Sequence, residues 1–317
     1  MTERYNSLNQ FLKEKFGVKV YKVSLEGGFT CPNRDGTKGF GGCIYCNPDS
    51  NSALSFREGS IKEQLVKGIE YIRTRHKGTG KFISYFQHYS NTYAPSLSPL
   101  PRGERVNKLE KLYLEALDHK DVVGLAISTR PDCLSEELFV LLEKLSRQTY
   151  LWLELGLQSA NEKTLALLNR GHTVTDFENG VRLAHKHGIE TCAHIIAGLP
   201  NETRNDLLKT IQFLNELKID GVKIHNLHII KNTKLAEMYE TDLIKVLDLE
   251  EYASLVVDCL ENLRPETLIH RFISHSPRHL TIAPMWSVNK LGTLNAVHNE
   301  LTRRDTYQGR LFAPPRV

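Results

Sequence analysis

Three cysteines in a glycine-rich stretch are the residues of this chain best suited to chemistry. Cys31, Cys43 and Cys46 lie within sixteen residues, with eleven residues between the first two and two between the last pair. Three thiolates on one loop can hold a single inorganic centre, and glycines let the backbone curl closely around it. A structural zinc ion takes four protein ligands, and the chain has no second Cys-x-x-Cys pair. A 4Fe–4S cluster held by three cysteines keeps one iron open to a small molecule, and we predict that centre here.

Zinc and unligated thiols are the alternatives for this stretch. His275 and His279 have the His-x3-His spacing of zinc ligands, although they lie far away in a proline-containing segment. The remaining cysteines, Cys133, Cys192 and Cys259, are isolated in apolar or helical surroundings, which is typical of buried thiols.

The stretch from Cys31 to Cys46 resembles the cluster loop of radical S-adenosylmethionine (SAM) enzymes. The resemblance implies that the amine and carboxylate of SAM chelate the open iron, and that Tyr45 packs near the adenine. The familiar spacing in that superfamily is C-x3-C-x2-C. The longer first gap is nearer to the Elongator catalytic-subunit branch and to the YtqA/YhcC-type proteins, an MnmL-like tRNA-modification branch. The resemblance spans residues 18 to about 300.

Apolar runs that alternate with helical patterns predict the elements that must position this loop. The predicted strands are 18–24, 81–87, 122–128, 150–158, 190–197 and 221–230. The predicted helices are 61–76, 106–117, 161–168, 175–187, 202–217 and one that Ser135 caps. Such alternation indicates an α/β fold whose parallel sheet is buried on both faces. We expect a partial (β/α)6 TIM-like barrel, with a doubly wound open sheet as the alternative.

The pattern predicts three parts. Residues 1–17 form an amphipathic lead-in and residues 18–230 form the barrel. Residues 231–317 form a C-terminal helical and strand extension that closes the open side and contacts substrate. Its predicted elements are helices 249–263 and 287–304 and one further strand, 267–273. Because active sites of such barrels lie at the C-terminal ends of the strands, polar residues there are candidates.

Polar side chains follow the second and third strands. Many relatives carry a Gly-Gly-Glu segment that accepts from the SAM amine, and this chain instead has Gln87 and Thr92 in that region. After the third strand, Ser128-Thr-Arg-Pro-Asp132 resembles the Thr-Arg-Pro-Asp of the Elongator branch, which implies contact of Ser128 with SAM or substrate. The alternative for this motif is an Arg130–Asp132 pair that caps a turn.

The fourth strand supplies the most specific set. Glu154 and Gln158 are followed, after a helix, by Asn-Arg-Gly-His with Arg170, in the order that the family shows. The resemblance implies that Glu154 and Gln158 reach the ribose or amino-acid groups of SAM, and that Arg170 pairs with its carboxylate. A planar guanidinium suits that role. A buried glutamate without a partner is costly, which also favours a site role for Glu154.

The last two strands of the predicted barrel add an imidazole and an apolar contact. The resemblance implies that His194 faces the SAM ribose, whereas a lone histidine in an apolar strand is usually a core residue. It also implies that adenine stacks near Leu227. Because alternate residues of a strand share a face, we expect either His225 or His228 to point inward, not both.

Composition and charge exclude little. The chain has 317 residues and a net charge of +4, and it shows neither a signal peptide nor an apolar run long enough to span a membrane, so we expect a cytoplasmic protein. Basic clusters lie at residues 13–22, 73–81 and 278–316. The basic and aromatic segment 270–290 suits a phosphate-rich substrate, and an ordinary capping segment is the equal alternative.

The resemblance implies a radical SAM enzyme that cleaves SAM at a 4Fe–4S cluster and abstracts hydrogen from its substrate. The branch further implies a tRNA wobble uridine, whose carboxymethylaminomethyl group is processed toward aminomethyl. Such an enzyme needs an electron donor such as flavodoxin or ferredoxin. The alternatives are a radical SAM enzyme that acts on a small metabolite and a non-catalytic, zinc-bearing RNA-binding module.

Overall fold

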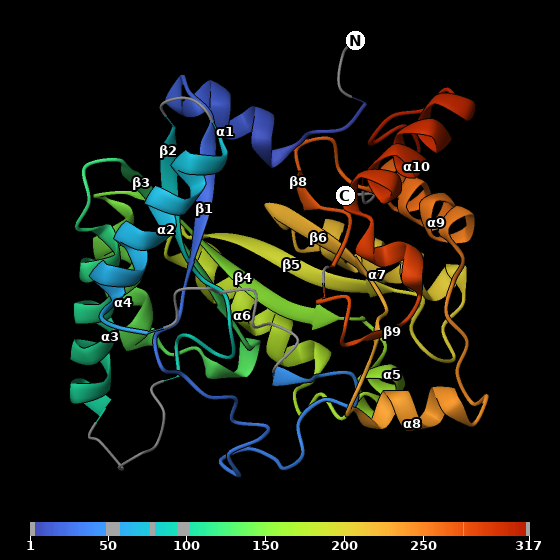
Figure 1. Cartoon of the computed structure of the whole chain (residues 1–317), viewed down its shortest axis with the longest axis horizontal. Helices are drawn as coiled ribbons and strands as arrows, with labels where there is room; N and C mark the ends of the chain where they lie inside the picture. The colour runs from blue at the N-terminus through green and yellow to red at the C-terminus, as the bar shows by residue number, and fades with distance from the viewer. Residues whose placement is uncertain (1–3, 49–57, 77–79, 94–101, 275, 315–317) are drawn as a thin grey trace.

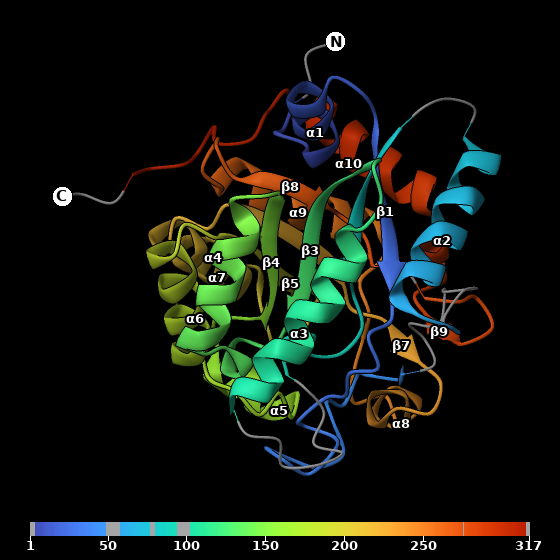
Figure 2. The ribbon, with the colours of Figure 1, turned by 90° about the vertical axis from the view of Figure 1, so that its left-hand side faces the viewer.

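A parallel sheet of seven strands forms the centre of the computed structural model, which describes residues 4–48, 58–76, 80–93, 102–274 and 276–314. The strand order is β1-β2-β3-β4-β5-β6-β8. The strands are β1 (Val20–Leu25), β2 (Lys81–Phe86), β3 (Val122–Thr129), β4 (Tyr150–Gln158), β5 (Glu190–Ala197), β6 (Gly221–Asn226) and β8 (Leu268–Arg271). The sheet curves into an open barrel with helices on its outer face (Figures 1 and 2). The predicted partial TIM-like α/β fold is confirmed, and the strand predicted over 267–273 joins the sheet as its seventh member.

The helices that link the strands agree with the predicted pattern. They are α1 (Leu8–Phe16), α2 (Ile61–Arg75), α3 (Arg102–Leu117), α4 (Glu136–Ser146), α5 (Glu162–Leu167), α6 (Val174–Lys186) and α7 (Arg204–Glu216). Ser135 is the N-cap of α4, as predicted, and its hydroxyl accepts the backbone N–H of Leu138 at 3.3 Å. Capping boxes begin α2, α6 and α7.

Alternation along β4 decides which residues face the inside of the barrel. Leu153 and Leu155 belong to the large core between the sheet and the outer helices. Trp152 belongs to a different apolar cluster, inside the barrel, while Glu154 and Gln158 line a pocket. Even-numbered residues of β4 therefore face the inside of the barrel, and odd-numbered residues face the outer helices, because successive side chains of a strand point to opposite faces.

The lead-in helix α1 closes the end of the barrel opposite the cysteine loop (Figure 1). Leu8 and Leu12 are buried and belong to the same apolar cluster as Trp152 and Ile83. The sequence predicted an amphipathic helix here, and its apolar face fills the bottom of the barrel. The pocket therefore lies at the C-terminal ends of the strands, where the cysteine loop also lies.

The part of the extension that the structure describes differs in detail from the prediction. The predicted strand 221–230 is interrupted, because β6 ends at Asn226 and β7 pairs antiparallel with β9. The predicted helix 287–304 is a short 3-10 turn, Met285–Val288, followed by α10. The elements of this region are β7 (Ile229–Ile230), α8 (Lys234–Glu240), α9 (Leu249–Asn262), β9 (Thr281–Ala283) and α10 (Lys290–Arg303). Helix α8 and the pairing of β7 with β9 were not predicted.

Several residues of the basic clusters form ion pairs within the chain. Arg73 and Lys81 both pair with Asp121, at 2.7 and 2.9 Å. Arg304 pairs with Asp258 at 2.6 Å. These cations are therefore less available to a phosphate backbone than the sequence indicated.

No helix in the described residues is both long enough and apolar enough to cross a lipid bilayer.

Candidate functional site

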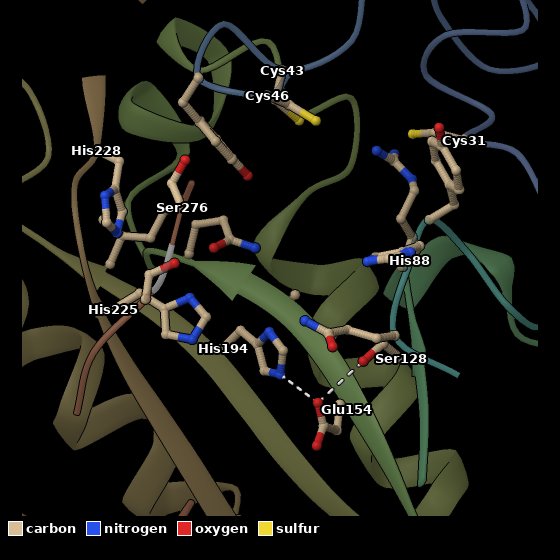
Figure 3. Close-up of a pocket in the computed structure, with 18 of the residues that line it drawn as sticks. Cys31, Cys43, Cys46, His88, Ser128, Glu154, His194, His225, His228 and Ser276 are labelled. Carbon is tan, nitrogen blue, oxygen red and sulfur yellow. Dashed lines mark hydrogen bonds and ion pairs between the residues drawn. The ribbon is translucent and has the colours of Figure 1, made fainter. Parts of the chain in front are cut away.

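A pocket of about 440 Å³ lies between the cysteine loop and the C-terminal ends of the strands. Figure 3 shows Cys43 and Cys46 on one side of it, Cys31 on another, and Glu154 at its floor. The structure brings nearly all of the predicted residues to this pocket. Those that line it are Cys31, Cys43, Cys46, Tyr45, Gln87, Ser128, Glu154, Gln158, Arg170, His194 and Leu227.

Thr92 is the predicted residue that the structure places outside the lining. Its hydroxyl is 2.6 Å from the hydroxyl of Thr129 and donates to the carbonyl of Cys133 at 2.9 Å. Thr92 therefore joins the segment after β2 to the turn after β3. In that turn Arg130 pairs with Asp132 at 2.9 Å, which is the capping alternative considered for this motif, while Arg130 also lines the pocket.

The three thiols of the cysteine loop are possible ligands of a metal centre. None of them forms a disulfide, and all line one pocket. Within the described part of the chain, no three His, Cys, Asp or Glu side chains come close enough together to hold one metal ion. A thiolate–zinc site needs its sulfurs about 2.3 Å from one ion, whereas a multi-iron cluster is held by thiolates around its outside. The zinc alternative depended on His275, which lies outside the described residues.

Arg170 lies directly against the cysteine loop. One guanidinium nitrogen is 3.4 Å from Cys43 Sγ and another donates to the carbonyl of Gly156 at 3.0 Å. A side chain at position 156 would meet this guanidinium, since a Cβ there would lie 2.4 Å from its nitrogen. Burial raises the pKa of Cys43, but the charge and hydrogen bond of Arg170 outweigh burial and bring that pKa below its ordinary value.

The other two thiols of the loop do not share the lowered pKa of Cys43. Burial raises the pKa of Cys46 to about 11, and the neighbouring Cys43 adds to the increase. Burial also raises the pKa of Cys31. A metal centre must therefore displace protons from these two thiols when it binds, which is the usual coupling of thiolate ligation to proton release.

Unpartnered polar atoms around the pocket fit a polar ligand. Buried polar atoms are normally hydrogen-bonded, and leaving one without a partner costs about 1–3 kcal/mol. Nε of Arg34 and of Arg170, near the thiols, have no hydrogen-bond partner among the described residues. Both can donate to the sulfides of a cluster, as outer hydrogen bonds commonly do. Asn226 Oδ1, on the strand side, also lacks a hydrogen-bond partner among the described residues.

Gln158 carries backbone strain at the end of β4. Its φ is 76°, a left-handed conformation that is uncommon for residues other than glycine, and the pairing of β4 with β5 is irregular between Gly156 and Gln158. Such strain concentrates at functional sites, where it aims a side chain. The sequence gives no signal for this feature, because glutamine is ordinary in a strand.

The floor of the pocket is a hydrogen-bonded group around Glu154, which is 1% exposed. Its carboxylate accepts from Ser128 at 3.1 Å and from His194 at 3.0 Å (Figure 3). It also accepts from Tyr85 and forms an ion pair with Lys223, whose ammonium is 2.9 Å from the Tyr85 hydroxyl. Tyr85 and Lys223 were not predicted as site residues. The alternation of side chains along β2 and β6 could have indicated that both face the inside of the barrel.

Two more donors keep Glu154 ionised. Trp152 Nε1 donates to it at 3.2 Å and Lys22 Nζ lies 3.6 Å from it. Burial opposes ionisation, but Lys223 and then Lys22 hold the pKa of Glu154 well below its usual range. Burial lowers the pKa of Lys223 to about 8, and the Glu154 charge opposes that effect. The floor of the pocket therefore holds a buried ion pair. Its cation, Lys223, is the partner that a buried Glu154 was expected to need.

Both candidate histidines of the last predicted strand line the pocket (Figure 3). The expectation that either His225 or His228 points inward, not both, was wrong. Strand alternation applies only as far as Asn226, where β6 ends, and the chain turns before Ile229. His228 therefore reaches the pocket from the connection between strands rather than from a strand face.

A pH prediction follows from His194. Burial, then the charge of Lys223, lowers the pKa of this ring to about 4, and Glu154 opposes the shift while Arg271 adds to it. An unfolded chain protonates the ring near pH 6.5, so the folded state loses stability as the pH falls from about 6.5 toward 4. We expect a loss of about 2 kcal/mol from this ring between about pH 7 and pH 5, measured as urea midpoints. His194→Gln should flatten this part of the dependence, and an unchanged slope would contradict the assignment.

Comparison with known proteins agrees with this geometry. The family model "Radical SAM superfamily" matches residues 30–214, and the model "Radical_SAM C-terminal domain" matches residues 219–303. The Bacillus subtilis protein YtqA is 42% identical over 98% of this chain and 93% of its own length. The Escherichia coli protein YhcC is 35% identical over 96% of this chain and 95% of its own length.

More distant similarity extends to Elongator proteins. Elongator complex protein 3 of Dictyostelium discoideum is 27% identical over 87% of this chain, which spans 54% of that relative. The archaeal Elp3 of Methanocaldococcus infernus shares the fold with a TM-score of 0.68 and 20% identity, covering 91% of this chain and 64% of the other. The family models, the two full-length relatives and the thiol-lined pocket lead to one conclusion. The chain belongs to the radical SAM superfamily and is an enzyme of that superfamily with an Elongator-like fold.

Proposed function

We propose that this enzyme uses a 4Fe–4S cluster and SAM to process the side chain of a tRNA wobble uridine, from carboxymethylaminomethyl toward aminomethyl. The observation that carries the catalytic part is the single pocket in which three free thiols face a ring of polar strand-end side chains. The substrate part rests on the resemblance to the YtqA/YhcC-type branch. We also propose a cytoplasmic location and a small electron-transfer protein such as flavodoxin or ferredoxin as the reductant.

The residues divide into a cluster side and a SAM side. Cys31, Cys43 and Cys46 would hold the cluster, which supplies the electron that cleaves SAM to methionine and a 5′-deoxyadenosyl radical. Arg170 places a positive charge beside Cys43 and suits an anion at this wall.

Polar and apolar groups of the strand ends would orient SAM. Gln158 is aimed by its strained backbone, and His194 is held by Glu154. Tyr45 and Leu227 offer apolar surface to the adenine, and Gln87 and Ser128 complete the lining. Thr92 would act through the loop that it holds rather than by touching SAM.

The size of the pocket restricts how tRNA can bind. A volume of about 440 Å³ holds a small molecule, so a tRNA must insert one unstacked nucleoside while its body stays outside. The anticodon loop is single-stranded, and proteins recognise RNA mainly at such unpaired bases.

The proposed conversion balances without a further oxidant. The carboxymethylaminomethyl group and one water become an aminomethyl group and a two-carbon aldehyde acid, which releases two electrons. Those electrons reduce SAM to methionine and 5′-deoxyadenosine, so one SAM is consumed in each turnover. Glu154, Lys223 and Tyr85 form a buried, charged floor beneath the site of this reaction.

Nucleoside analysis tests the substrate. In a strain that lacks the protein, mass spectrometry of digested tRNA should show accumulation of the carboxymethylaminomethyl uridine and loss of its aminomethyl product. Expression of the wild-type chain should reverse both changes, and a Cys46→Ala chain should not. An unchanged nucleoside profile would reject tRNA as the substrate and leave the small-metabolite alternative. Binding of tRNA that weakens steeply with salt would independently favour tRNA.

A further inference from the structure

Two cations that line the pocket, Arg271 and Lys290, come from β8 and α10 rather than from the cysteine loop. Arg271, the last residue of β8, lines the pocket and donates from its guanidinium to Nε2 of His225 at 3.2 Å. An arginine only donates, so Nε2 of His225 is the acceptor and the ring is neutral. Burial, followed by the charge of Arg271, holds the pKa of His225 well below its ordinary value. A neutral His225 therefore leaves the Arg271 charge uncompensated.

Lys290 adds a second charge to the pocket lining. It is the first residue of α10 and lines the pocket, and burial together with the Arg271 charge lowers its pKa. Among the described residues, no carboxylate forms an ion pair with Arg271 or Lys290. Glu154 is the one acid among the described residues that line the pocket, and Lys223 already pairs with it. Arg271 and Lys290 thus both line the pocket without an ion-pair partner among the described residues; Arg271 is half-buried, and Lys290 also reaches solvent.

Buried donors also line the pocket. Ser276 is 3% exposed, yet its hydroxyl has no hydrogen-bond partner among the described residues, and the same holds for the buried Nε of Arg271. Figure 3 shows Ser276 on the same side of the pocket as His225 and His228. Such groups are costly unless a ligand satisfies them.

We propose that Arg271, Lys290 and Ser276 form a subsite that binds the carboxylate of the substrate side chain. This inference rests on the proposed function, in which the reacting group ends in a carboxymethyl carboxylate. A guanidinium matches a carboxylate as a planar fork, Lys290 adds a point charge, and a serine hydroxyl adds a neutral donor. The cations that act on the cysteine thiols are Arg34, Arg130 and Arg170. Arg271 comes from β8 and is left for a second anion. By binding the carboxylate, the subsite holds the carbon atom between the carboxylate and the amine of the substrate side chain inside the pocket.

Binding measurements on the anaerobically reconstituted, SAM-loaded protein test the subsite. The probes are 5-carboxymethylaminomethyluridine, 5-aminomethyluridine and uridine 5′-monophosphate. Calorimetry measures the affinity of the protein for each probe. The variants are Arg271→Gln and Lys290→Gln, with Arg278→Gln as the control, since Arg278 is exposed and does not line the pocket. Iron content and the SAM-induced change in the EPR spectrum establish that each variant is folded and loaded.

The expected result is selective. The wild type and Arg278→Gln bind the carboxylate probe roughly 10- to 100-fold more tightly than the aminomethyl probe, and Arg271→Gln removes that preference. Lys290→Gln reduces the preference in part, with SAM binding unchanged in all variants. Three results would overturn the subsite: no preference in the wild type, loss of SAM affinity in Arg271→Gln, or an equal loss for the monophosphate probe. If the strain that lacks the protein shows the expected change in its tRNA nucleosides, any of these three results rejects the subsite alone and leaves the proposed function standing.

Discussion

A Cys43→Ala variant is expected to lose the iron–sulfur centre and with it SAM cleavage. Cys43 is the buried thiol whose pKa the Arg170 guanidinium brings below its ordinary value, which makes it the thiolate best prepared for metal. Loss of even an outer partner of a metal ligand typically costs 10- to 100-fold, so loss of a ligand should lower 5′-deoxyadenosine formation by more than roughly 100-fold. The measurements are iron and sulfide content after anaerobic reconstitution and EPR of the reduced protein with and without SAM.

Cys259→Ala is the matched control. Cys259 is fully buried in α9 within the outer core, and it does not line the pocket. This variant should keep the wild-type iron content and a 4Fe–4S signal that shifts when SAM is added. Stoichiometric zinc and no such signal in the wild type would overturn the radical SAM mechanism for this chain, whatever the variants show.

The second large effect is expected on stability, from Lys223→Met. Lys223 is 3% exposed and its partner Glu154 is 1% exposed, so the substitution leaves a buried carboxylate without its main counterion. Removing one partner of a buried pair typically costs about 3–5 kcal/mol. Lys22, at 3.6 Å, remains and should place the loss at the lower end of that range. Urea unfolding at neutral pH measures it.

A double variant and a surface variant make this test specific. Glu154→Gln combined with Lys223→Met removes the isolated charge and should recover much of the lost stability. Lys62→Met breaks an exposed ion pair with Asp118 and should leave the midpoint unchanged. A Lys223→Met protein as stable as the wild type would show that the floor of the pocket is hydrated and that the pair is not a structural element.

Local sequence patterns were sufficient for the elements and for most of the lining. The apolar run of β4 predicted a strand buried on both faces, and period-two alternation places Glu154 and Gln158 on the inner side with Trp152. The spacing of Cys43 and Cys46 determined that both lie on one loop. These features are local, because they depend on side-chain types over a few neighbouring positions.

The partners of these residues could not be predicted in the same way. Lys223 meets Glu154 from a strand 69 positions away along the chain, and Arg271 meets His225 across 46 positions. Such pairs depend on the register between strands and on the curvature of the sheet, which the sequence of one strand does not encode. Thr92 illustrates the same limit, since its hydroxyl bonds to Thr129 at the end of β3 and does not line the pocket.

By itself, the sequence determined a cysteine loop after the first strand, a parallel α/β barrel and the polar residues at its strand ends, because ligand spacing and hydrophobic periodicity are local properties. Only the tertiary structure decided that Arg170 faces Cys43, that Lys223 neutralises Glu154, and that Arg271 and Lys290 both line the pocket. The reason is physical: a charge acquires its pKa and its binding role from the groups that surround it in space, and those groups come from distant parts of the chain.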